Sequence, residues 1–387
     1  MSNARFWSIA AVLLLLCVLA LGWGLARLNL ASFSNQVGDR LQLLNELRRG
    51  AMQQYFSTAE AELKFWASSP QLVVAQQELL RRWQEEEAES FSARVRRDYI
   101  DNNPFPPGEM RNYQRAGDTS YCDLHAELQP VASLFVTQRG YYDFFLVGLD
   151  GYVYFSVEKE DDFGTSLLTG PYRSTGLGQA FRAAVQSPGE VVLTDMAPYA
   201  PSADAPAMFM AQTVVDPMGL TIGVLALQLP TNQILGIMGY LEGMGESGET
   251  YLVGDDGLMR SDSRFSDAST VLKLRVDTRT VARALAGEEG VEFTPDYRDV
   301  EVLSAYSSMA VGDTRWAVMA EIDREEIVAL AAGEMPDLAG VLALVYGLSL
   351  WTLWYWRGRH MPGEDGAAIQ AVDLGGGDSA GESGLLS

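Results

Sequence analysis

Two long apolar runs constrain this chain more than any other feature. Residues 6–26 read FWSIAAVLLLLCVLALGWGLA, and residues 338–356 read LAGVLALVYGLSLWTLWYW. Neither run contains a charged residue, and as a helix each would be about 30 Å long, which matches the hydrocarbon core of a bilayer. We therefore predict transmembrane helices over residues 6–27 and 337–356. The alternatives are a cleaved signal peptide for the first run and a buried soluble helix for the second.

The flanking charges predict an orientation for these spans. Arg5 precedes the first run, and Arg357, Arg359 and His360 follow the second. Basic residues favour the cytoplasmic side, so both chain ends are expected in the cytoplasm. The predicted protein is a two-pass protein of the cytoplasmic (inner) membrane, in contact with its lipid, with residues 28–336 extracytoplasmic. Residues 1–5 form a short cytoplasmic N-terminus, and residues 357–387, rich in Gly, Ser and acidic residues, predict a disordered cytoplasmic tail.

Charge and motif content exclude several function classes. The net charge of −23 argues against nucleic acid, whose phosphates need Lys and Arg. Two cysteines and two histidines support neither a disulfide framework nor a zinc site. No phosphate-binding loop, dinucleotide fingerprint or zinc-protease motif occurs. The acidic residues of 158–162 lack the EF-hand pattern, so we interpret them as a solvated loop. We expect no enzyme, no catalytic residue, no metal and no cofactor.

The extracytoplasmic segment begins with helical patterns. From residue 28 to about 67, apolar residues recur every three or four positions, which is typical of a helix with one apolar stripe. We interpret it as a stalk helix that pairs with its own copy in a homodimer or packs only on its own domain. Pro70 ends it, and residues 71–99 predict a second long helix, so that residues 28–99 form one helical region.

Two strand-rich segments follow, and they repeat one order of elements. Residues 141–172 hold two apolar strands around Asp150-Gly151, which is typical of a tight hairpin. The fold class is therefore α+β: a long N-terminal stalk helix carrying two tandem PAS-like antiparallel-sheet modules, at residues 100–235 and 236–335, between two transmembrane helices. The expected elements after the hairpin are a helix at 176–186, strands at 190–194, 207–215, 220–228, 249–253 and 257–261, a helix at 278–286, and strands at 290–294, 300–307 and 315–321.

The hairpin indicates a ligand pocket. If residues 152–156 alternate, Tyr152, Tyr154 and Ser156 share one face and offer hydroxyl groups to a cavity. Polar side chains at strand ends would fix the orientation of a ligand. Lys159 suits an anionic group and Asp195 a cationic one, whereas the alternative for each is surface exposure or a structural hydrogen bond. The predicted ligand-binding residues are Tyr154, Lys159, Tyr172, Asp195 and Tyr199.

Several sequence blocks carry a family resemblance. These include RDYIDNNPFPPGE (97–109), RGYYDFFLVGLDGYVYFSVEKEDDFGTSLLTGPY (139–172), LTDMAPYAPSADAPAMF (193–209) and GESGETYLVGDDGLMRSDSRF (245–265). The chain resembles the double-Cache sensor domains of bacterial methyl-accepting chemotaxis proteins, sensor histidine kinases and adenylate cyclases over about residues 30–335. The resemblance implies a small ligand in the membrane-distal module, 100–235. Amino-acid-binding members carry an Arg-x-Trp-Tyr block where this chain has GPYRSTGLGQAF, which argues against an α-amino acid.

The predicted function is that of a membrane-anchored extracytoplasmic small-molecule sensor in signal transduction or chemotaxis. Receptors of this kind continue past the second span into a HAMP-type linker and a transmitter module, whereas only residues 357–387 follow it here. We therefore expect the output to be relayed in trans to a separate signalling transmitter protein. The alternatives are a truncated chemotaxis receptor and a ligand-binding membrane protein without signalling.

Overall fold

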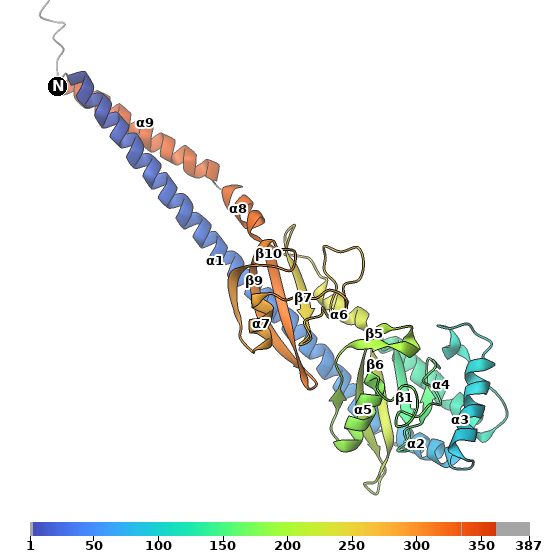
Figure 1. Ribbon diagram of the computed structural model, residues 1–387. Coiled ribbons are helices and arrows are strands. Elements are labelled where there is room, and N and C mark those ends of the chain that lie inside the picture. The colour runs from blue at the N-terminus through green and yellow to red at the C-terminus, as the bar shows by residue number, and fades with distance from the viewer. Residues whose placement is uncertain (1–2, 334, 361–387) are drawn as a thin grey trace, which may run out of the picture. The chain divides into compact units, whose positions relative to one another are not determined.

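The computed structural model describes residues 3–333 and 335–360 (Figure 1). The chain divides into a large unit, Gln36–Glu326, and a unit formed by Met1–Asn35 and Ile327–Ser387. The large unit contains two antiparallel sheets, so the predicted α+β class with a long N-terminal helix is confirmed.

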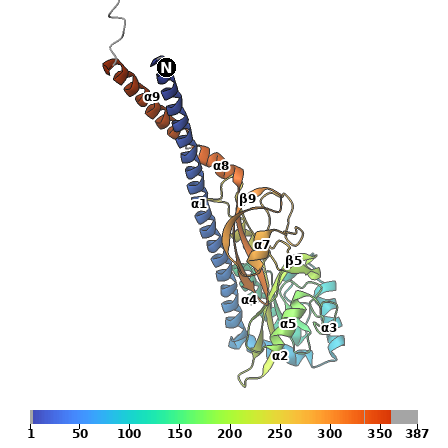
Figure 2. The same ribbon diagram turned by 60° about the vertical axis from the view of Figure 1, so that its left-hand side comes forward.

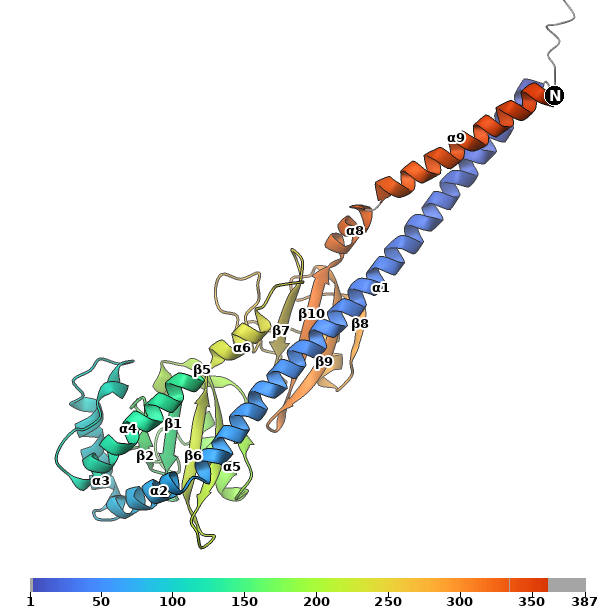
Figure 3. The same ribbon diagram turned by 180° about the vertical axis from the view of Figure 1, so that it is seen from behind.

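The long helix α1 (Asn3–Ala67) follows the predicted apolar spacing, and its stripe packs on both sheets of the large unit. Asn45 bonds to strands of the second sheet, while Trp66 packs on Phe144 of the first. Ser69 then caps α2 (Pro70–Trp83), because its side chain accepts a hydrogen bond from the Leu72 amide at 3.2 Å. Figure 3 shows α1 running along β9 and β10.

The predicted second long helix is broken in the structure. It consists of α2, then α3 (Ala88–Arg96) and the single-turn helix η1 (Arg97–Asp101). Three consecutive glutamates, at 85–87, occupy the interruption, and Glu87 has an extended backbone. Glu85 pairs with Arg82 and Glu86 with Arg94, and the extended backbone of Glu87 interrupts the helix before α3.

The first module is built on a sheet of strand order β2-β1-β6-β5-β3, with β4 paired to β5. Phe144 of β1 contacts Phe135 of α4, whereas Phe145 faces Phe209 beside α5, so these helices cover opposite faces (Figure 2). The hairpin predicted at Asp150-Gly151 is present. The elements of this module are η2 (Met110–Asn112), α4 (Ser120–Arg139), β1 (Asp143–Val147), β2 (Val153–Ser156), α5 (Gly176–Gln186), β3 (Val192–Leu193), β4 (Ala197–Tyr199), η3 (Ala200–Ser202), β5 (Ala205–Val215) and β6 (Thr221–Leu229).

The second module has the sheet order β7-β10-β9-β8. The strand predicted at 257–261 is wrong, because only isolated bridges form there, Val253 to Met259 and Leu258 to Arg275. The Leu252 amide donates to the Ser261 hydroxyl at 3.0 Å, so a side chain takes the place of a ladder partner. The elements of this module are α6 (Thr231–Met238), β7 (Glu249–Val253), α7 (Arg279–Leu285), β8 (Gly290–Pro295), β9 (Glu301–Val311) and β10 (Thr314–Asp323).

The end unit holds the apolar runs. Among the described residues, two helices are long and apolar enough to cross a membrane: α1 within Ser8–Ala67, and α9 (Met335–His360) at Ala339–Trp356. None of the residues in the apolar windows of these two helices is buried inside the structure. Helix α8 (Arg324–Gly333) precedes α9. Helix α9 includes residues 357–360, which the sequence assigned to the tail, and the rest of the predicted disordered tail lies outside the described residues.

Candidate functional site

The first module buries a group of charged and polar side chains around the turn that follows β2. We call it the polar cluster. It lies where β1 begins and where β2, β4 and β6 end, so polar side chains from four strands meet at one end of the sheet. Its members are all at most 5% exposed: Asp143, Ser156, Glu158, Lys159, Asp162, Tyr199 and Gln228.

Asp143 organises the turn after β2. Its Oδ1 accepts hydrogen bonds from the amides of Val157 at 2.8 Å and Glu158 at 3.1 Å, and its Oδ2 accepts from the Ser156 hydroxyl at 2.6 Å. Burial, with the charges of Glu158 and Asp162, raises the pKa of Asp143 well above its usual range. A carboxyl group at the first position of β1 therefore fixes the loop that carries Lys159.

Lys159 is held in an unusual conformation. Its φ is +58°, a left-handed value that lysine rarely adopts. The ammonium donates to the Val157 carbonyl at 3.1 Å, and burial lowers the pKa of Lys159 to about 7. No carboxylate of the described residues lies in ion-pair contact with it. The fold thus keeps a desolvated amine inside the module.

Asp162 and Gln228 present acceptors that are not used. Tyr199 donates its hydroxyl to Asp162 Oδ2, and burial raises the pKa of Asp162 to about 7. Within the described part of the chain, Asp162 Oδ1 and Gln228 Oε1 are buried and have no hydrogen-bond partner. Such groups cost free energy unless something pairs with them, so they are suited to a ligand that donates hydrogen bonds.

A polar pocket lies beside this cluster. Its volume is about 370 Å³. Arg111 pairs with Glu158, and the Gln129 amide donates to the Val157 carbonyl at 3.0 Å, so the pocket wall touches the polar cluster directly. Gln129 Oε1 is buried and has no partner among the described residues. The pocket is lined by Arg111, Asn112, Gln114, Gln129, Pro130, Ser133, Leu134 and Thr137.

The structure brings together two of the five sequence-predicted site residues, Lys159 and Tyr199. Tyr154 is buried against Trp83 with ring centroids 4.6 Å apart, and its hydroxyl bonds to Asp150 at 3.1 Å inside the hairpin. Tyr172 is half-buried at the turn before α5. Asp195 contacts the second module, as described below. The expected shared face of hydroxyl groups does not open into one pocket.

Sequence reasoning missed several members of the polar cluster. Asp143 is the one charged residue of the otherwise apolar strand β1, and a charge in such a strand could have indicated a buried polar site. The interpretation of 158–162 as a solvated loop is wrong for Glu158 and Asp162, which are buried because Arg111 and Tyr199 supply partners for them. Gln228 and Arg111 carried no local signal.

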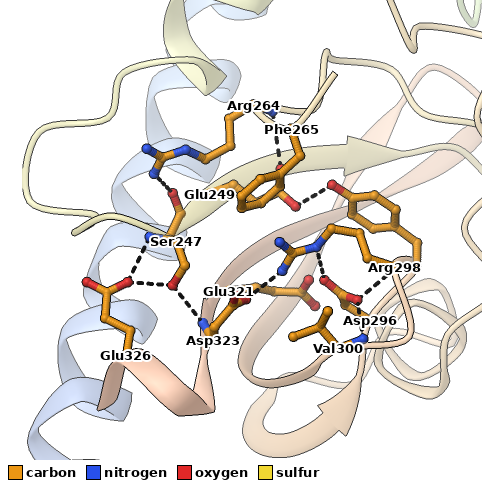
Figure 4. Close-up of polar contacts among 12 residues, drawn as sticks. Ser247, Glu249, Arg264, Phe265, Asp296, Arg298, Val300, Glu321, Asp323 and Glu326 are labelled. Atoms are coloured by element: carbon orange, nitrogen blue, oxygen red, sulfur yellow. Dashed lines mark hydrogen bonds and ion pairs between the residues drawn. The ribbon is translucent and has the colours of Figure 1, made fainter. Parts of the chain in front are cut away.

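The second module has its own acidic group, which Figure 4 shows. Carboxylate oxygens of Glu249, Asp296 and Glu321 lie within 4.8 Å of one another, and all three residues are buried. Tyr297 donates to Glu249 at 2.6 Å, and Arg298 donates to Asp296 at 2.6 Å. Burial raises the pKa of Glu321 to about 7. Oxygen ligands of this type suit a hard cation, but here the chain supplies donors to each carboxylate.

No family model matches the chain. A curated relative, the probable chemoreceptor y4sI of Sinorhizobium fredii (strain NBRC 101917 / NGR234), is 25% identical over 233 residues. The match covers 60% of this chain and 28% of the relative, so the chain spans less than a third of the relative's length.

Similar solved structures are ligand-binding domains of chemoreceptors. The domain of Pseudomonas fluorescens CtaA with L-serine is 13% identical at a TM-score of 0.43, covering 77% of this chain and 99% of that one. The domain of Pseudomonas aeruginosa PctB with L-Arg is 14% identical at 0.41, covering 76% and 97%. The sensory domain of Campylobacter jejuni Tlp3 (CcmL) is 11% identical at 0.47, covering 78% and 99%. The predicted resemblance to sensor domains of chemoreceptors is confirmed.

Proposed function

We propose that this chain is a membrane-anchored extracytoplasmic small-molecule sensor of the double-Cache type, acting in chemotaxis or another signal-transduction pathway. The observation that carries the proposal is the polar cluster, which buries a desolvated lysine and unpartnered acceptors. A polar pocket contacts this cluster through Arg111 and Gln129. Ionisable groups with strongly shifted pKa values gather at functional sites more often than elsewhere. The chemoreceptor relative and the absence of a nucleophile or acid–base set from the sequence motifs support a binding role over catalysis.

The proposed ligand is a small polar molecule that donates hydrogen bonds to Asp162 and Gln228. Lys159, Tyr199 and Arg111 would complete its contacts. Tyr172 stays a proposed contact at the edge of the module. Tyr154 and Asp195 would act on the site only indirectly, since each is engaged elsewhere. The ligands named for CtaA and PctB, L-serine and L-Arg, belong to the same broad class of small polar donors.

The anchoring and output are further parts of the proposal. The two apolar helices would hold the chain in the membrane with the large unit outside the cytoplasm. The signal would pass to a separate transmitter protein, and two copies of the chain would pair through the exposed face of α1. Cross-linking in membranes, followed by identification of the linked proteins, tests both contacts: a chain that links to neither its copy nor a signalling protein would contradict them.

A thermal-shift screen of the detergent-solubilised full chain against small polar metabolites tests the ligand site. Binding to the folded state raises the melting temperature by mass action. We expect Lys159→Ala and Tyr199→Phe to abolish the shift given by a positive compound. Lys273→Ala, an exposed lysine of the second module, is the matched control and should leave the shift unchanged. Full retention of the shift in both cluster variants would show that the site is elsewhere.

A further inference from the structure

The two modules are joined by a buried arginine. Arg260, which is 1% exposed, belongs to the second module, and its guanidinium donates twice to Asp195 of the first, from Nη2 at 2.7 Å and from Nε at 3.2 Å. Trp316 of β10 donates its indole N–H to the same carboxylate at 2.8 Å. We call these three residues the junction. On the outer side of the guanidinium, Nη1 of Arg260 donates to Oδ1 of Asp256 at 3.0 Å.

The junction is built with little freedom. A side chain at Gly254 would lie 2.3 Å from the Arg260 guanidinium carbon, so the backbone there closes over the group. A side chain at Gly312, in the turn before β10, would meet the Leu193 carbonyl of β3 at 2.0 Å. The Arg260 side chain is 1% exposed and the Asp195 side chain is 22% exposed. A bidentate pair of this kind tolerates little sliding, because each displaced hydrogen bond leaves the buried guanidinium less well paired. Motion of Asp195 must therefore move β10 or break the junction.

One side of the junction leads to the polar cluster. Asp195 and Tyr199 are four residues apart in the segment that includes β4. Tyr199 is hydrogen-bonded to Asp162, whose second oxygen has no partner in the described structure. A change at Asp162 thus reaches Asp195 through a short, largely extended piece of chain.

The other side leads along β10 to the start of α8. Trp316 lies near the beginning of this strand and Asp323 at its end. The Asp323 amide donates to the Ser247 hydroxyl at 3.1 Å, and its carboxylate pairs with Arg298 at 2.5 Å (Figure 4). Glu326 accepts from the Ser247 amide at 2.7 Å. Strand β10, which contributes Trp316 to the junction, therefore ends at the contacts that hold the first turn of α8.

We propose that the junction of Asp195, Arg260 and Trp316 couples the state of the polar cluster to β10 and the first turn of α8. This inference rests on the proposed function, since it assigns the ligand site a route of output. In this proposal the second module responds to the first through the junction, and β10 carries the response.

A double-mutant cycle on the full chain in detergent tests the coupling without any ligand. The perturbation is Asp162→Asn, and the readout is amide hydrogen exchange in residues 318–326. We expect exchange there to change by at least about threefold in the wild-type background. With Trp316→Phe, which keeps an aromatic ring but removes the indole donor and leaves a smaller side chain in the core, or with Asp195→Asn, the effect of Asp162→Asn should fall by more than about half.

Asp256→Asn is the control, because it weakens the outer contact of Arg260, keeps an oxygen that can accept from the Leu258 amide, and should leave the threefold effect in place. Equal effects of Asp162→Asn in all backgrounds, or no effect in the wild-type background, would overturn the coupling. Failure of the ligand site is separable: a compound found in the thermal-shift screen should still bind the Trp316→Phe variant with an unchanged shift. Loss of binding there would mean that the junction shapes the site and does not relay its state.

Discussion

At the scale of single residues, burial raises the pKa of Asp162 to about 7 and lowers the pKa of Lys159 to about 7, and both residues belong to the polar cluster. Burial disfavours the charged form of each, so the two groups respond to pH in opposite senses. Asp162 carries a buried charge above about pH 7, and Lys159 carries one below it. Each buried charge lowers the free energy of unfolding unless a partner compensates for its desolvation.

We predict that Asp162→Asn stabilises the protein above pH 7. The folded pKa of about 7 lies above that of an unfolded carboxyl group, so the folded state binds more protons between about pH 4 and 7 and stability falls as pH rises through this window. Asparagine removes that penalty. The expected gain is absent near pH 4 and reaches about 2–4 kcal/mol at pH 8. Unfolding of both proteins across this range measures it.

The matched control for this prediction is Asp204→Asn, an exposed carboxylate in the turn after η3. It should leave the pH profile unchanged. Glu321 also titrates near neutrality, but its contribution is common to wild type and variant and cancels in the difference. A stability difference that does not vary with pH would contradict the burial of an ionising Asp162.

At the scale of elements, α1 is fastened to the second sheet by one polar side chain. Asn45 is 2% exposed and donates to the carbonyls of Ala305 at 3.1 Å and Val318 at 2.6 Å, and it accepts from Ser307. A buried amide with both ends engaged fixes the register of the helix against β9 and β10.

Asn45→Ala should therefore destabilise the large unit by about 1–3 kcal/mol, because it removes a side chain that satisfies three buried polar groups. Gln42→Ala, one turn earlier on the exposed face of α1, should change stability by less than about 0.5 kcal/mol. Chemical denaturation of both variants measures the difference. Equal midpoints would show that Asn45 does not fasten the helix.

Two glycines offer a pair of substitutions with opposite signs. Gly254→Ala places a methyl group 2.3 Å from the Arg260 guanidinium carbon and should cost about 1–3 kcal/mol. Gly236→Ala, in α6 with nothing within 4 Å, should stabilise by about 0.5–1 kcal/mol through reduced backbone entropy in the unfolded chain. In thermal unfolding, we expect a lower midpoint for Gly254→Ala and a higher midpoint for Gly236→Ala. Midpoint shifts of the same sign for both variants would contradict the packing at Arg260.

Local patterns predicted the elements well where one short-range cause decides the structure. Helix α5 matches its predicted range because Thr175 caps it, and the hairpin forms because Gly151 adopts a positive φ. The site was harder, since its contacts are long-range. The sequence suggested a ligand as the partner of Asp195. Its partner in the structure is Arg260, which lies 65 residues later in the chain, and no local pattern predicts such a pair. Lys159 and Tyr199, which were selected because they stand at strand ends, lie in the polar cluster, and their role in binding a ligand stays a prediction.

At the scale of the whole molecule, the proposed topology makes the large unit extracytoplasmic. We predict that Ser174→Cys, an exposed site of the first module, is labelled by a membrane-impermeant maleimide in intact cells when Cys17 and Cys122 are replaced by serine. The cysteine-free chain is the control for background labelling. Labelling that requires cell lysis would place the module in the cytoplasm and contradict the topology.

The junction has a consequence for receptor engineering. Exchanging one module for that of a chemoreceptor is a natural way to build a chimera with new ligand specificity. In this chain, a donor module without a carboxylate at the position of Asp195 would leave Arg260 buried beside Trp316 with only Asp256 to balance it. Removing one partner of a fully buried ion pair costs about 3–5 kcal/mol. The cost here should be lower, because Asp195 is 22% exposed and Asp256 still pairs with Arg260, but it would weaken a graft that is otherwise well chosen. A chimera that folds should therefore retain all three junction residues: a carboxylate at the position of Asp195 in its first module, and Arg260 and Trp316 in its second.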